Sequence, residues 1–338
     1  MSEFAFSGMG LNPHYGQCYS IWDRETRRLP GGSSSGSAVS VAEGIVPATM
    51  GSDTAGSCRI PAAFNGIVGV KPSYGRLSLK GVFPLSPTSD APGPLGIDLD
   101  SCYLLDRAMV LPQAVAHSLP SSRGGEKRSI EGMRLWVPES IVLEDLDESV
   151  SRGFARSLAW LEEAGAILVR KPFDVIDRCV TMFQTRAVVL YEAYQAHARW
   201  LEQYPDLYDP FVLRRISNGR GVSEQEQQKR YRDKQQIVAD FSAQFLQEGV
   251  DAIIYPTVSS IPPTVSSAQD PDQVAQINLG CLRNTSTANY FDGCSLTLPC
   301  HDRGEAPVGL MVSTVHGRDD ELYEVGFAIE SVLNANRR

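Results

Sequence analysis

Two glycine-rich segments carry serines in a setting that suits nucleophilic catalysis. The first, Gly31–Gly36, reads GGSSSG, and the second, Gly51–Ser57, reads GSDTAGS. A serine hydroxyl attacks a carbonyl only when a base removes its proton, and the oxyanion that forms needs preorganised N–H donors. Successive amides in a tight turn can point at one spot. We therefore expect the backbone N–H groups of the second segment to form an oxyanion hole, made by Thr54, Ala55, Gly56 and Ser57.

Three other interpretations apply to the first segment, Gly31–Gly36. A flexible linker would not lead directly into the small-residue, helix-like run at 37–46. A phosphate-binding loop of the Walker type ends in Gly-Lys-Ser/Thr, and the first lysine of this chain is Lys71. A hydrolase elbow of the G-x-S-x-G type would make Ser34 the nucleophile. That motif requires a buried strand before it, which residues 23–31 do not resemble, and none of the five histidines is a convincing partner.

The composition is that of a globular protein. The 338 residues are 42% hydrophobic and 21% charged, with a formal net charge of −9, which argues against a nucleic-acid-binding surface. Seven cysteines without a zinc or disulfide spacing suit a reducing compartment, so we expect a cytoplasmic protein. The first residues do not resemble a signal peptide, and no apolar run is long enough to span a membrane.

The elements expected around the two loops are those of an α/β protein. A strand at 133–139, an amphipathic helix at 144–165 and a strand at 166–172 form a unit that is typical of a partly parallel sheet. Residues 175–248 are predicted to be mostly helical, with a helix that begins at Ser223 and stops at Gly249. Residues 111–130 are the best candidate for an exposed connection. Further strands are expected at 66–72, 81–87, 250–258, 294–300 and 308–314, and a closing helix at 319–333.

Taken together, the two loops and their surroundings carry a family resemblance. The run from Pro30 to Gly96 closely resembles the amidase signature family, whose members hydrolyse or transfer carboxamides. The segment before it and the later stretches DAIIYPTV and APVGLMVST also match. The resemblance implies a single domain over 1–338, with a central mixed sheet covered by helices on both faces and without the family's usual N-terminal segment. It further implies a signature core at about 1–110, a substrate-pocket region at about 130–290, and final strands with a helix at about 250–338.

The resemblance also implies roles for individual residues. Ser57 falls on the family's nucleophile, and Ser33 on the serine that relays its proton after a cis peptide bond. Ser34 and Ser35 are expected to hydrogen-bond within the loop and the helix start. The family often carries Gly where Ala55 stands, a mild departure if its φ is negative. Arg59 falls where the family often has an arginine, and we expect it to be structural or near the substrate and not catalytic.

The third catalytic residue that the resemblance implies is a lysine well upstream of Ser33, and this chain has no counterpart of that segment. Lys71 falls on a position that the family keeps as lysine but does not use as its base. Lys80 lies in a predicted turn. The remaining lysines, 127, 171, 229 and 234, lie in later segments that we expect to be exposed. The sequence is therefore either an N-terminally shortened amidase or a short form that has lost hydrolysis, and we expect weak activity from this chain.

Three functions stay open at this point. The first is a small-molecule amidase that acts through a seryl acyl-enzyme, without a metal or organic cofactor. The second is the glutaminase subunit of a tRNA-dependent amidotransferase, which typically reads RQPA after its nucleophile, whereas this chain reads RIPA at Arg59–Ala62. The third is a non-catalytic scaffold that keeps the fold. The implied partner is a small amide substrate, not a nucleic acid or a membrane, and a homodimer is an open alternative to a monomer.

Overall fold

The structure, a computed structural model, describes residues 1–110, 128–185 and 187–337. Its centre is one eight-stranded mixed sheet with the order β1-β3-β2-β7-β8-β6-β4-β5. The strands are β1 (Ala48–Asp53), β2 (Val68–Lys71), β3 (Ala91–Gly96), β4 (Arg134–Glu139), β5 (Ile167–Pro172), β6 (Ala252–Pro256), β7 (Cys294–Pro299) and β8 (Gly309–Thr314). β4 pairs in parallel with β5 and β6, and the other neighbouring pairs are antiparallel. The expected mixed sheet is confirmed.

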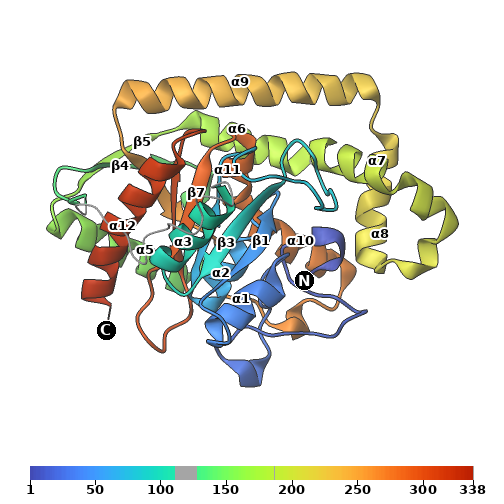
Figure 1. The fold of residues 1–338 in the computed structure, drawn as a ribbon, viewed down its shortest axis with the longest axis horizontal. Coiled ribbons are helices and arrows are strands. Elements are labelled where there is room, and N and C mark those ends of the chain that lie inside the picture. The colour runs from blue at the N-terminus through green and yellow to red at the C-terminus, as the bar shows by residue number, and fades with distance from the viewer. Residues whose placement is uncertain (111–127, 186, 338) are drawn as a thin grey trace.

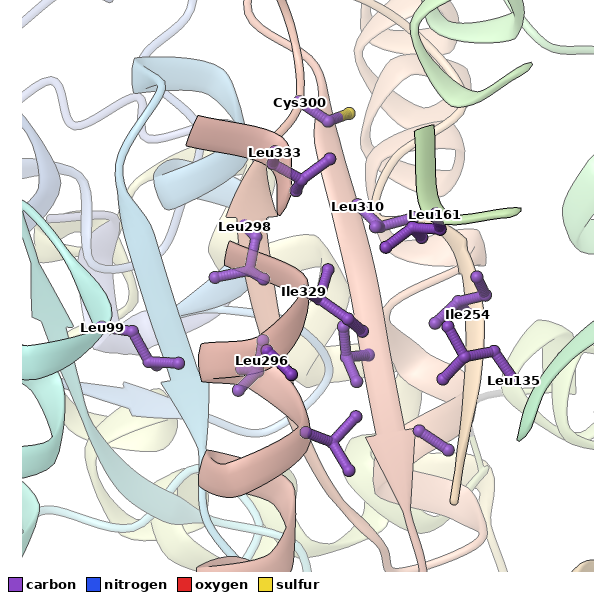
Figure 2. Close-up of a cluster of buried hydrophobic side chains, with 14 of the residues drawn as sticks. Leu99, Leu135, Leu161, Ile254, Leu296, Leu298, Cys300, Leu310, Ile329 and Leu333 are labelled. Atoms are coloured by element: carbon purple, nitrogen blue, oxygen red, sulfur yellow. The ribbon is translucent and has the colours of Figure 1, made fainter. Parts of the chain in front are cut away.

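Helices cover both faces of this sheet because its central strands alternate their apolar side chains between two cores. Along β4, Leu135 and Val137 enter one core while Trp136 enters the other. The first core joins the sheet to α3 (Leu99–Val110), α5 (Glu148–Glu163) and α12 (Asp319–Asn336). Figure 2 shows Ile329 and Leu333 of α12 among the leucines of the strands.

The second core lies on the opposite face and is rich in aromatic rings. Phe241 stacks on Phe291 at 3.7 Å, and Trp136 stacks on Phe173 at 4.0 Å between ring centroids. This core joins the sheet to α2 (Arg59–Asn65), α6 (Asp174–Thr185), α9 (Glu224–Glu248), α10 (Pro271–Arg283) and α11 (Ser286–Tyr290). The central strands β2, β7, β8 and β6 are therefore buried on both faces.

The region predicted to be mostly helical is confirmed as such. It holds α6, α7 (Ala187–Gln203), α8 (Pro210–Ser217) and α9. The Ser223 side chain caps α9 by accepting from the Glu226 amide, and Gly249 ends it with a φ of +61°. Figure 1 shows α9 as one long helix along an edge of the molecule, beside α6 and α7.

The strand predicted at 81–87 is wrong, since these residues form a loop. Two prolines, Pro84 and Pro87, interrupt the run and lack amide donors. The amides of Leu85 and Ser86 donate to the carboxylate of Asp90 instead of to a neighbouring strand. The Asp90 carboxylate thus accepts the hydrogen bonds that a neighbouring strand would accept in a sheet.

Two strands of the sheet were not predicted, β1 and β3. Both are short and rich in Gly, Pro, Ser or Asp, which are poor strand formers. β3 tolerates Pro92 and Pro94 because it pairs with β2 only through Leu95 and Gly96. The remaining helix, α1 (Ser35–Ala42), packs its small residues against α2 and β1. The predicted connection at 111–130 lies mostly outside the described residues.

Candidate active site

The two serine loops meet at the start of two helices. Ser33 and Ser34 directly precede α1, and Ser57 lies in the turn between β1 and α2. The Ser34 amide donates to the Ser57 carbonyl at 3.2 Å, which holds the loops against each other. The peptide bond between Gly32 and Ser33 is cis, as the resemblance implied. The fold thus brings together the two serines that the sequence singled out.

The three serines of the first loop have different environments. Ser33 is fully buried, and its Oγ has no hydrogen-bond partner among the described residues. The Ser34 hydroxyl contacts β1, donating to the Ser52 carbonyl and accepting from the Ser52 amide, both at 3.3 Å. Ser34 is therefore bound to the sheet and not to its own loop, and Ser35 Oγ has no partner among the described residues, so the expectation for these two was wrong.

A buried ion pair fixes the second loop. The Asp53 carboxylate at the end of β1 meets Arg59 at the start of α2, with Nη2–Oδ1 at 2.9 Å, and both side chains are fully buried. Asp53 also accepts from the amides of Gly56, at 2.7 Å, and Cys58, at 3.1 Å. Burial alone would raise the pKa of Asp53, but the Arg59 charge and hydrogen bonds outweigh it and leave the pKa below its ordinary value. Arg59 has the structural role that was one of our two expectations for it.

The oxyanion-hole candidates do not all have a free amide. The Gly56 N–H already donates to Asp53, which leaves the amides of Thr54, Ala55 and Ser57 as candidates. Ala55 does not have a positive φ, so its side chain fits where the family often has glycine. Gly56 has a φ of +125°, and a Cβ there would overlap Thr285. That position accepts glycine alone without a shift of the loop.

A second carboxylate holds the other end of the turn. Thr54 Oγ1 donates to Asp90 Oδ1 at 2.6 Å, and burial raises the pKa of Asp90. Ser86, whose amide also donates to Asp90, gives its hydroxyl to Glu192 of α7 at 2.6 Å. Tyr231 of α9 donates to the same Glu192. This chain of hydrogen bonds ties the turn to the two helices.

A small pocket with room for only about 30 Å³ opens beside Ser57, and we name it the Ser57 cavity. Thr54, Ala55 and Ser57 form one side of it. The rest of the wall is largely apolar and is supplied by Phe6, Leu85, Phe183, Val189 and Leu282. Two larger polar side chains complete it, Arg215 of α8 and Tyr290 of α11. Ser57 and the residues of its turn therefore border this cavity.

None of the described lysines contacts Ser33. Lys71 is buried, and its Nζ donates to the carbonyls of Pro72 and Gly293 at 2.9 and 2.8 Å, which agrees with a structural role. Lys80 lies in a turn, as predicted. Lys171 and Lys229 are exposed, as expected, and Lys171 pairs with Glu248. The expectation for Lys234 was wrong, since this side chain is partly buried and donates to the Thr88 carbonyl and the Ser89 hydroxyl. Lys127 lies outside the described residues.

Sequence reasoning missed several residues of this site. Asp53 and Asp90 each had a local signal, since Asp53 stands just before the glycine-containing turn and Asp90 directly follows the loop that contains Pro84 and Pro87. Asn289, which bridges Asp53 and Arg59, had none, because it is more than 200 residues away in the sequence. Arg215 likewise reaches the cavity only through the tertiary fold.

The comparisons with known sequences agree on one family. Residues 1–323 match the family model described as Amidase. The chain is 30% identical over 336 residues to the 2-amino-5-chloromuconic acid deaminase of Comamonas testosteroni, covering 98% of this chain and 70% of the relative. It is also 30% identical over 359 residues to a glutamyl-tRNA(Gln) amidotransferase subunit of Symbiobacterium thermophilum, covering 98% and 72%.

Solved structures show the same relationship. A crystal structure described as an amidase superposes with a TM-score of 0.82 at 27% identity, covering 97% of this chain and 72% of that one. The corresponding glutamyl-tRNA(Gln) amidotransferase subunit of Thermotoga maritima superposes with a TM-score of 0.79 at 25% identity, covering 99% and 72%. No helix in the described ranges is long and apolar enough to cross a bilayer. From its sequence, its sheet and its paired serine loops, the chain belongs to the amidase family.

Proposed function

We propose that this protein is an amidohydrolase that cleaves a carboxamide through an acyl-enzyme on Ser57. The observation that carries the proposal is the position of Ser57, which lies on the wall of a small cavity beside the amides of Thr54 and Ala55. In the first step, Ser57 Oγ attacks the amide carbonyl carbon. Amides aimed at the developing oxyanion stabilise that transition state more than the substrate. The C–N bond then breaks, and ammonia or an amine leaves.

Ser33 is the proposed proton relay. Its hydroxyl is buried beside the Ser57 loop and has no hydrogen-bond partner among the described residues. A buried polar group in such a state is costly, and in an active site it marks a position that another group is meant to fill. In the relay, Ser33 takes the proton from Ser57 and passes it to a base, and the proton then goes to the leaving amine. Water later attacks the ester and releases the acid.

The base itself has no candidate among the described lysines. We therefore propose that the 338-residue polypeptide turns amides over slowly, because the loss of one member of a coupled catalytic set lowers the rate by several orders of magnitude. The first alternative is the glutaminase subunit of an amidotransferase. Co-purification with a partner subunit and glutamine-dependent release of ammonia would support this alternative. The second is a scaffold without catalysis, which the lack of a candidate base among the described lysines favours.

Ammonia release from a simple amide tests the proposal directly. We expect a slow rate from the unaltered chain that falls to the uncatalysed level in Ser57→Ala. Ser34→Ala is the matched control, since its hydroxyl contacts β1 and takes no part in the proposed chemistry. A rate that survives in Ser57→Ala would refute the nucleophile. Rapid turnover by the unaltered chain would refute the proposed weakness.

A further inference from the structure

A second pocket, with room for about 270 Å³, lies beside the N-terminal residues and shares no lining residue with the Ser57 cavity. Five of its seven lining residues are aromatic, and one of the other two is a carboxylate. The proposed chemistry at Ser57 uses none of them. We name it the Trp200 pocket, and its lining consists of Glu3, Phe4, Phe83, Trp200, Tyr204, Leu207 and Tyr208.

The aromatic rings form a continuous wall of this pocket. The ring centroid of Phe83 lies 5.5 Å from those of Phe4 and Trp200, and the ring of Phe4 lies 5.5 Å from that of Tyr208. These neighbouring rings are inclined by 36° to 45°, so none of them lies flat on the next. Phe4, Phe83 and Trp200 therefore stay 38% to 47% exposed. Exposed apolar side chains gathered in one hollow are typical of a binding site.

One buried histidine of α7 supports the wall. His197 is fully buried, and its Nδ1 lies 2.9 Å from the Tyr208 hydroxyl. Burial lowers the pKa of His197 to about 4, so this ring brings no positive charge to the pocket at neutral pH. Its ring centroid lies 4.4, 5.2, 5.7 and 5.9 Å from those of Phe4, Phe83, Tyr208 and Trp200.

The backbone holds Phe4 at the pocket in an uncommon conformation. Its φ of +47° lies in the left-handed region, which bulky residues rarely adopt. Contacts of the residues before it fix this geometry: the Ser2 amide donates to the Ser33 carbonyl at 3.1 Å, and Glu3 Oε2 accepts from the Asp209 amide at 2.8 Å. Strain of this kind persists where the surroundings impose it, and it is frequent at positions that clamp a ligand.

The charge and the rings of the pocket both favour a cation. Among the lining residues, all of which the structure describes, only Glu3 is charged. Its Oε1 lies 3.2 Å from Nε2 of His14, which is positive only when protonated. The faces of aromatic rings carry the negative part of the ring quadrupole and attract cations. A quaternary ammonium suits such a site best, because its methyl groups are apolar and it has no N–H donors that need acceptors.

We propose that the Trp200 pocket binds the quaternary ammonium group of a small molecule. The head group contacts the rings of Phe4, Phe83 and Trp200, and the Glu3 carboxylate balances its charge. The rest of the ligand extends into an adjoining hollow with room for about 960 Å³, which Glu3, Phe4 and Phe83 also line. This site is independent of the proposed function, since no step at Ser57 involves it.

Two ligands of nearly the same shape test the role of the charge. Choline carries a trimethylammonium group, and 3,3-dimethylbutan-1-ol carries a neutral tert-butyl group in its place. Ligand-observed NMR measures the affinity of each for the full chain at pH 8, where histidine side chains are mostly neutral. We expect choline to bind about 10-fold more tightly or better, as contact between a cation and several rings allows. Equal affinities, or no binding of choline, would overturn the proposal.

Two substitutions assign the preference to this pocket. Trp200→Leu keeps an apolar wall but removes the ring face, and it should lower the affinity for choline by roughly 5- to 30-fold. Glu3→Gln keeps an acceptor for the Asp209 amide but removes the charge, and it should also weaken choline. In both variants the affinity for 3,3-dimethylbutan-1-ol should change little, which shows that the pocket is intact.

Trp22→Leu is the matched control. Trp22 also faces a cation, with the central carbon of the Arg28 guanidinium 4.4 Å from its ring, but it does not line the Trp200 pocket. This substitution should leave the preference for choline unchanged. A preference that survives in Trp200→Leu would overturn the assignment. Ser57→Ala should bind choline as the unaltered chain does, so the proposed amidase function and this site stand or fall by separate measurements.

Discussion

The buried pair of Asp53 and Arg59 offers a sharp test of how the nucleophile loop is held. Asp53 accepts hydrogen bonds from Arg59, from the amides of Gly56 and Cys58, and from the Asn289 side chain at 3.0 Å. Asp53→Asn removes the negative charge and turns one acceptor into a donor that faces other donors. Removing one partner of a fully buried ion pair costs about 3–5 kcal/mol, because the remaining charge is left uncompensated.

For a chain of this length, that cost should lower the midpoint of thermal unfolding by roughly 4–7 °C, given the entropy of unfolding per residue. Differential scanning calorimetry and urea unfolding of Asp53→Asn give the two values. The matched control is Asp240→Asn, since Asp240 pairs with Arg178 at 2.7 Å on the surface. Its change should be much smaller, because solvent screens exposed pairs. Equal effects of the two substitutions would refute the view that Asp53 and Arg59 form the frame of the loop.

Three further substitutions test contacts elsewhere in the fold. Phe241→Ala should lower the free energy of unfolding by about 3–5 kcal/mol in urea titrations, because it leaves a cavity in the aromatic core beside Phe291. Gly56→Ala should cost roughly 2–5 kcal/mol in the same assay, from its positive φ and its overlap with Thr285; a neutral result would show that the turn is not constrained as described. Glu330 provides a pH test, since burial raises its pKa to about 7. Because the folded-state pKa of this carboxyl is raised, its contribution to stability is complete at a pH below its unfolded-state pKa and is lost as the pH rises to about 7. Glu330→Gln should therefore be more stable than the unaltered chain at about pH 8 and similar to it at about pH 4.

Much of the fold could be predicted from the sequence, where local pattern and tertiary packing agree. The strand–helix–strand unit is confirmed as β4, α5 and β5, because an amphipathic helix between two apolar strands has few other ways to bury its face. The Asp147 side chain caps α5 by accepting from the Ser149 amide, and Gly165 follows it with a φ of +97°. These signals are local, so the sequence contains them in full.

The failures have a common physical cause, which is that distant partners override local preference. The run at 81–87 looks like a strand, yet Asp90 takes its amides. β1 and β3 have weak strand propensity and are stabilised by pairing with each other over six residue pairs. In the site, the serine loops were evident from their glycines, but Asn289 and Arg215 enter it from helices that only the tertiary fold brings near.

The central claim is that Ser57 is the nucleophile, and one labelling experiment tests it most directly. The folded chain is treated with a fluorophosphonate, digested, and mapped by mass spectrometry. We predict an adduct on Ser57 that disappears in Ser57→Ala and persists in Ser34→Ala. An adduct on Ser33 or Ser34 instead, or no adduct on the folded chain, would contradict the account.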